Sequence, residues 1–184
     1  MVIIDRLKEE HQAILLMLQV LEAACKKLEA GEAVNKDDLY KMVDFIKIFA
    51  DKSHHHKEED LLFPAIVEAG IPKDGGPIGV MLAEHTMGRN FVKGMSQALE
   101  EFSAGSTEAS AQIVSNARGY IGLLTDHIYK EDNILYPMAE MHITAEKHNE
   151  LLKEFEQVIP DKIGVDKHKE LIENLNQLKD AYLK

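Results

Sequence analysis

Two stretches of the chain repeat each other, and this repeat limits the fold more than any other feature of the sequence. The segment HHHKEEDLLFP occupies residues 54–64, and HIYKEDNILYP occupies residues 127–137, 73 positions later. The two share His, Lys, Glu, Leu and Pro at the same relative positions, without a gap. A repeat at a fixed offset indicates that two parts of one chain fold as equivalent units.

The repeat extends upstream to a single histidine in each half. EEHQAILLML surrounds His11, and AEHTMGRNFV surrounds His85, 74 positions later. Each half is therefore predicted to contain a helix with one histidine, followed by a helix with the motif His-x-x-x-Glu. The first motif is His54 with Glu58.

Apolar residues at three-to-four spacing predict helices along most of the chain, so that the expected fold class is all-α. The predicted helices cover about 5–30, 36–63, 78–102 and 109–136, with two shorter helices over 144–184. Asp5 and Asn35 are candidate N-caps, because Asp and Asn side chains accept hydrogen bonds from the first free amides of a helix. Pro64 is expected to disturb the last turn of the second helix, and the fourth is expected to end before Pro137.

The motif His-x-x-x-Glu places two potential metal ligands on one face of a helix. Residues four apart are offset by about 40° and about 6 Å of rise, so that their side chains project toward one point. Apolar residues at helical spacing around His127 predict that it and Glu131 face the core. A buried carboxylate costs several kcal/mol unless it is paired or binds a metal. Two such glutamates with four histidines therefore favour a metal site.

The predicted ligand set is too large for one structural zinc ion, which takes four ligands. It comprises His11, His54, Glu58, His85, His127 and Glu131. Six ligands suit two ions that share bridging carboxylates. A nitrogen and oxygen set without thiolate favours iron, with manganese or zinc as alternatives. We expect Glu58 and Glu131 to bridge, while the sequence leaves open which histidines bind which ion.

Composition excludes some partners. The chain has 184 residues and a formal net charge of −11, which repels phosphate backbones and anionic lipids, so that neither nucleic acid nor membrane is an expected partner. Its single cysteine, Cys25, cannot form an internal disulfide, and MVIID, the first five residues, meets charge too early for a signal peptide. A cytoplasmic location is therefore expected.

Several other residues that could bind metal are predicted not to. His55 and His56 correspond in the repeat to Ile128 and Tyr129, which predicts that they lie at the surface or at the rim of the site. Tyr120 is interpreted as a core or interface residue.

The residues resemble the hemerythrin-like, HHE cation-binding family over about 5–140. The resemblance rests on one inward histidine on the first and third helices and on His-x-x-x-Glu followed by E/D-x-x-L-[FY]-P on the second and fourth. It implies an antiparallel up-down-up-down four-helix bundle over 1–143. Residues 144–184 would then be a C-terminal helical extension packed on the bundle, or an element that caps one end or supports a homodimer.

The ligand pattern departs from that of oxygen-carrying hemerythrins. These proteins place His-x-x-x-His on the third helix and His-x-x-x-x-Asp on the fourth. Here Arg89 stands four residues after His85, and Glu131 stands four rather than five residues after His127. The set is more similar to bacterial di-iron proteins linked to repair of damaged iron–sulfur centres and to hemerythrin domains that sense iron and oxygen.

The resemblance implies a non-haem di-iron protein, with an oxo- or hydroxo-bridged pair of iron ions. Such a protein would bind or react with dioxygen, peroxide or nitric oxide, in sensing or in stress defence and iron-centre repair. The alternative is a binding protein that senses or stores iron or oxygen without turnover. The sequence does not identify an electron donor.

Overall fold

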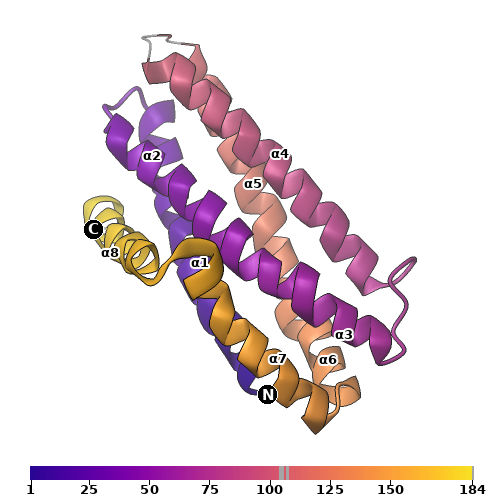
Figure 1. Ribbon diagram of the computed structural model, residues 1–184. Helices are drawn as coiled ribbons and strands as arrows, with labels where there is room; N and C mark the ends of the chain where they lie inside the picture. Colours follow the sequence, from indigo (N-terminus) through magenta and orange to yellow (C-terminus); the bar gives the residue numbers. More distant parts are fainter. Residues whose placement is uncertain (104–105, 107, 184) are drawn as a thin grey trace.

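The computed structural model describes residues 1–103, 106 and 108–183, and these form an all-α bundle of four antiparallel rods (Figure 1). Two rods are single helices, α1 (Val2–Glu29) and α4 (Pro77–Ser103). The other two are composite: α2 (Lys36–Phe45), η1 (Ile46–His55), η2 (Lys57–Leu62) and α3 (Phe63–Glu68) form the second rod, and α5 (Ala109–Lys130), η3 (Glu131–Leu135) and α6 (Tyr136–His142) form the fourth. The predicted fold class is confirmed. No described helix is long and apolar enough to cross a membrane.

The segments η1, η2 and η3 are π-helical, and they carry the repeated motifs. The amide of His56 donates to the carbonyl of Asp51, and the amide of Tyr136 donates to that of Glu131, both five residues back. A π turn contains more residues than an α turn, so that consecutive side chains diverge by a smaller angle. Neighbouring residues can therefore face the same side of the rod.

The helix ends agree with the sequence except at two points. The Asn35 side chain accepts a hydrogen bond from the Asp37 amide at 2.9 Å, as predicted for an N-cap. Asp5 is not a cap, because α1 begins at Val2 and Asp5 lies within its first turn. The rods also continue past both prolines. Each proline occupies the start of an α segment that follows a π turn, where a missing amide hydrogen has little cost.

The core consists of two apolar clusters, and the histidines lie between them. One cluster contains Ile14 and the following apolar residues of α1, whereas Ile3, Ile4 and Leu7 belong to the other. The same division falls between Met81 and Val92 on α4. The predicted site therefore lies in the middle of the bundle, with apolar packing toward both ends.

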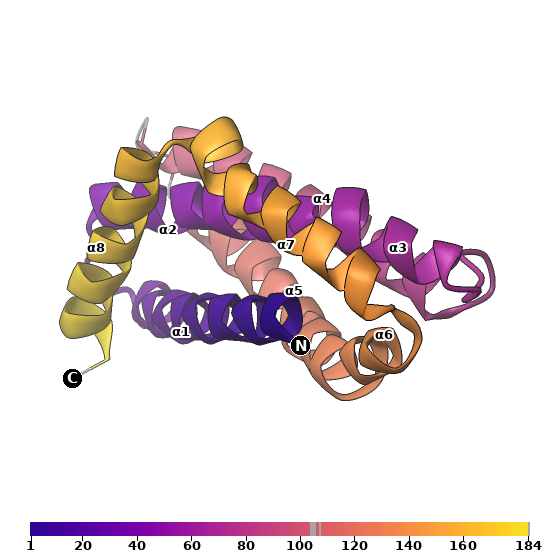
Figure 2. The ribbon, with the colours of Figure 1, turned by 60° about the horizontal axis from the view of Figure 1, so that its bottom comes forward.

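The last part of the described chain, α7 (Ala145–Val158), η4 (Ile159–Ile163) and α8 (Val165–Tyr182), covers one side of the bundle (Figure 2). Leu151 and Phe155 of α7 join the cluster around Leu7, and α8 joins the other cluster through Leu171, Leu175 and Leu178. The connection between the predicted helices 78–102 and 109–136 includes residues outside the described part of the chain.

Candidate metal centre

All four rods contribute to one buried cluster of imidazoles and carboxylates. Its seven side chains are between 0% and 5% exposed, and they are His11 of α1, His54 and His55 of η1, Glu58 of η2, His85 of α4, His127 of α5 and Glu131 of η3. The structure thus brings the six predicted ligands together and adds His55.

The cluster divides into two groups that could each hold one ion. His11, His54, Glu58 and Glu131 form one group, and His55, Glu58, His85 and His127 form the other; within each, the potential ligand atoms lie within 4.8 Å of one another. Glu58 belongs to both groups. The arrangement therefore suits two ions with a shared carboxylate rather than one.

Glu131 also spans the two groups. Its Oε2 atom lies 3.2 Å from Nε2 of His11, and its Oε1 atom lies 3.1 Å from Nε2 of His127. Oε2 of Glu58 lies 3.6 Å from Nε2 of His54 and 3.5 Å from Nε2 of His85. Each glutamate is thus placed between imidazoles of different groups, as a bridging ligand would be.

Several inward-facing atoms have no protein partner. Among the described residues, Nε2 of His54, Oε2 of Glu58 and both oxygens of Glu131 lack an aligned hydrogen bond although they are buried. Buried polar atoms in folded proteins are almost always satisfied. Cations bound between these oxygens and ring nitrogens would satisfy them, so the donor set fits a metal pair.

Each imidazole is oriented by an outer carboxylate at its Nδ1 atom. The distances are 2.9 Å for His11 with Asp132, 3.0 Å for His54 with Glu10, 3.3 Å for His55 with Asp51, 2.7 Å for His85 with Glu59 and 2.8 Å for His127 with Glu84. An Nδ1–H group that donates outward leaves the Nε2 lone pair pointing inward, which is how ligand histidines are fixed in metal sites.

Cations lie behind most of these outer carboxylates. Lys57 binds Glu10 and Lys130 binds Glu84, in equivalent positions of the two halves. Arg89 donates to Asp51 at 2.8 Å and to Glu59 at 2.6 Å. Burial raises the pKa of Glu10, but its hydrogen bond to His54 and the charge of Lys57 outweigh burial and lower the pKa to about 2. Glu10 therefore stays ionised.

Glu58 and Glu131 differ in charge when no metal is bound. Burial and the charge of Glu131 raise the pKa of Glu58 well above its usual value. Glu131 shifts the other way: burial opposes its ionisation, but the positive charge of His127 and the close approach of the His11 ring lower its pKa. The metal-free pair consequently favours a single negative charge. The Tyr136 hydroxyl donates to Oε1 of Glu58 at 2.6 Å.

The sequence pattern of the Hemerythrin HHE cation binding domain matches residues 2–139. The chain belongs to the hemerythrin family. The match covers all four rods, and every residue of the buried cluster lies within it.

Relatives differ in how much of the chain they match. An uncharacterized protein of Mycobacterium tuberculosis (strain H37Rv) is 22% identical over 152 residues, which is 83% of this chain and 59% of the relative. The iron-sulfur cluster repair protein YtfE of Yersinia pestis (strain Pestoides F) is 34% identical over 89 residues, 47% of this chain and 40% of YtfE. The hemerythrin-family chain thus spans about three fifths of the mycobacterial relative's length. No solved structure matches it significantly.

His55 corrects one expectation about this hemerythrin-family chain. It is 5% exposed and stacks on the ring of His85, with 3.9 Å between ring centroids, so the expectation that it lies at the surface or rim is wrong. Its counterpart Ile128 is also buried, at 3% exposure, so the apolar residue at this position of the repeat indicated the core rather than the rim. His56 is only half-buried and pairs with Asp60, which agrees with its predicted place at the rim.

Three other groups were missed or only partly anticipated. The glutamates before His11 and His85 are Glu10 and Glu84, and the shared offset of 74 positions would have revealed their common role. Tyr136 gave no signal, because its counterpart in the other half is Phe63.

Proposed function

We propose that the chain holds two iron ions and binds or reacts with a small oxidant, such as dioxygen, peroxide or nitric oxide. The observation that carries this proposal is the buried cluster of five imidazoles and two carboxylates, in two groups that share Glu58. Two ferrous ions held there would supply electrons to an oxidant. Manganese or zinc would suit the same nitrogen and oxygen atoms, so metal content is the first measurement.

The two groups are unequal, and this difference supports a site for a small ligand. One group has three imidazoles, whereas the group with His11 and His54 has two. The hydroxyl of Tyr136 lies beside the second group, 3.4 Å from Nε2 of His11. We therefore propose that the small ligand binds on this side, beside Tyr136 and the Glu58 carboxyl to which it donates, and the apolar clusters at both ends of the site keep bulk water away.

The name of the YtfE relative favours a role in repair of iron–sulfur centres or in stress defence. A metal centre that keeps its protein ligands while it reacts with an oxidant would suit such a role. The alternative is a protein that senses or stores iron or oxygen without turnover. All seven side chains are nearly completely buried, which would slow the entry and release of small molecules at the metal site. Slow exchange favours this alternative over rapid turnover.

Metal analysis and visible spectroscopy of protein from iron-supplied cells test the centre itself. We expect about two irons per chain and charge-transfer bands, both lost when Glu58→Ala and Glu131→Ala are combined and both retained in His56→Ala. A stable protein without metal after iron supply contradicts the proposal. Steady consumption of peroxide or nitric oxide supports turnover, whereas a spectral change without consumption supports the sensor or store.

A further inference from the structure

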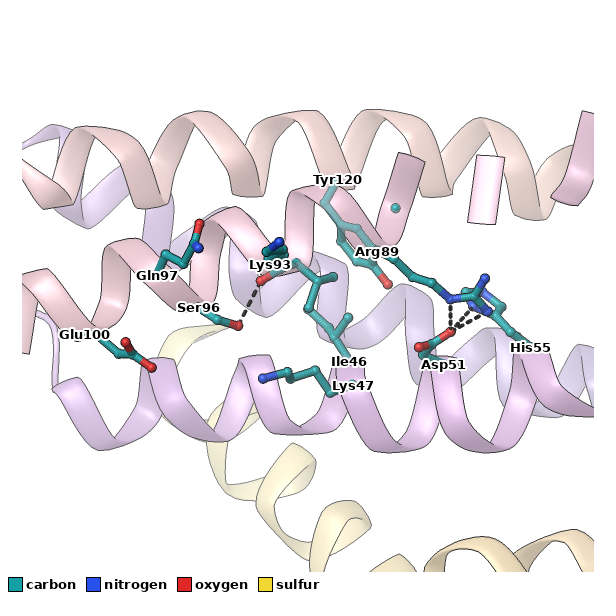
Figure 3. A pocket seen from close by; sticks show the side chains of 12 residues that line it. Ile46, Lys47, Asp51, His55, Arg89, Lys93, Ser96, Gln97, Glu100 and Tyr120 are labelled. Carbon is teal, nitrogen blue, oxygen red and sulfur yellow. Dashed lines mark hydrogen bonds and ion pairs between the residues drawn. The ribbon is translucent and has the colours of Figure 1, made fainter. Parts of the chain in front are cut away.

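A pocket of about 550 Å³ opens between η1, α4 and α5, next to the buried cluster (Figure 3). His55 and Asp51 lie at one end, as Figure 3 shows, and Glu100 and Gln97 lie at the other. The volume falls within the range of small-molecule sites, about 300–1,000 Å³. A diatomic molecule or peroxide needs only a small part of this space, so the pocket is larger than the small oxidant requires.

Tyr120 presents its hydroxyl to this pocket. The side chain is 2% exposed, and no described residue forms a hydrogen bond with its hydroxyl. In Figure 3 the hydroxyl points toward the end of the pocket with Asp51 and His55, and no interaction with the other lining residues is drawn. A hydrogen-bonding group of a ligand in the pocket would therefore find this hydroxyl free.

The walls combine apolar surface with unpaired cations. Ile46 and Val92 are buried and line the middle of the pocket. Lys47 and Lys93 lie on opposite walls, are exposed, and form no ion pair with a described residue. Asp51 accepts hydrogen bonds from Arg89 and His55, and the guanidinium of Arg89 offsets part of its charge. Glu100 at the far end offsets one of the two lysines, so the middle of the pocket keeps a small excess of positive charge in a chain whose net charge is −11.

We propose that this pocket binds a small organic anion, with its apolar body between Ile46 and Val92, its hydrogen-bonding group at Tyr120 and its anionic group between Lys47 and Lys93. One end of the ligand would lie against His55, a member of the metal cluster. Binding itself does not depend on the metal, whereas an effect of binding on the centre rests on the proposed function.

Binding is tested by calorimetry on the full chain with three probes: 2-naphthoate, indole-3-acetate and decanoate. We expect at least one of them to bind with a stoichiometry of one, both before and after removal of metal. If 2-naphthoate binds, the neutral 2-naphthamide should bind at least about five-fold more weakly. Absence of one-to-one binding by all three probes at millimolar concentration overturns the proposal, as does equal binding of amide and acid.

Variants locate the bound anion. Lys93→Met and Tyr120→Phe should each weaken binding about five-fold, the effect of one lost hydrogen bond or charge contact. Gly88→Ala should also weaken it, because the added methyl group narrows the pocket while it meets Tyr120 at an ordinary 3.5 Å. Lys169→Met on α8 is the matched control and should bind normally. Binding that survives all three pocket variants places the anion elsewhere and overturns the proposal.

The iron-loaded protein separates this proposal from the proposed function. Binding that shifts the visible spectrum supports both. Binding by protein that takes up no iron supports the pocket and contradicts the di-iron centre.

Discussion

Replacing Glu58 with glutamine should stabilise the metal-free protein and weaken the metal-loaded one. Glu58 is fully buried, and burial together with the charge of Glu131 raises its pKa well above 4.5 in the folded chain. Folding the metal-free chain at neutral pH therefore requires that this carboxyl take up a proton. Glutamine is neutral without that proton and has nearly the same shape, and its amide oxygen can still accept the hydrogen bond from Tyr136.

The size of this effect follows from the pKa difference. Taking up a proton costs about 1.4 kcal/mol for each pH unit above the pKa of the unfolded chain. At pH 7 the cost approaches about 3 kcal/mol for a carboxyl with an unfolded pKa of 4.5 that stays protonated in the fold. The sign is fixed by the raised folded pKa: the cost is absent below pH 4.5 and grows as pH rises toward the folded pKa. Glu58→Gln should therefore gain up to about 3 kcal/mol at pH 7 and nothing near pH 4.5.

Urea unfolding of chelator-treated protein at both pH values measures the gain, and the same experiment with metal should show a loss. Glu59→Gln is the matched control with the opposite sign. Burial raises the pKa of Glu59, but His85 and Arg89 outweigh burial and lower it to about 2, so that its charge stabilises the fold above pH 4.5. If Glu58→Gln leaves the metal-free protein unchanged or less stable at pH 7, the carboxyl does not hold a costly proton and this reasoning fails.

Three other predictions concern the metal ligands and their support. His55→Ala should lower metal content or affinity while His56→Ala leaves both unchanged; equal behaviour in metal analysis would remove His55 from the site. Arg89→Gln releases Asp51 and Glu59 and should weaken metal affinity about 10–100-fold in competition with a chelator, as loss of outer support does in other sites, whereas Arg118→Gln, on a distant surface, should not. Chelation should lower the melting temperature, because metal at 100 times its dissociation constant stabilises the fold by about 2.7 kcal/mol. An unchanged melting temperature would contradict a metal site that forms only on folding.

Apolar spacing predicted the helices, and the repeat grouped six residues at one site. Neither pattern could predict the side-chain contacts in which the two halves of the chain differ. Helical spacing and His-x-x-x-Glu are local patterns, so they located His54 with Glu58 and His127 with Glu131 before any contact was known. Whether all six bind metal stays a prediction. His55 was missed because its apolar counterpart Ile128, itself buried, was not taken to indicate a core position. The π turn in η1 was also not predicted, because it arises from backbone hydrogen bonds that no residue type announces.

The continuation of the rods past the two prolines was missed for the same reason. An α-helix would lose a hydrogen bond at Pro64, but the π turn before it changes which carbonyl is left free. The division at residue 144 between a bundle and an extension also stays a prediction, although α7 and α8 share the two apolar clusters with the four rods.

The hydrogen-bond register of the second rod affects how its consecutive imidazoles approach the site. In an α-helix, consecutive residues diverge by about 100°, and both can still be buried in this bundle, as His127 and Ile128 of α5 are. The π turns of η1 reduce this divergence, and His54 and His55 each offer an atom to a different group of the cluster. A deletion that restored α-helical turns in η1 would therefore change how the two imidazoles approach the shared Glu58, while every histidine remained in the sequence.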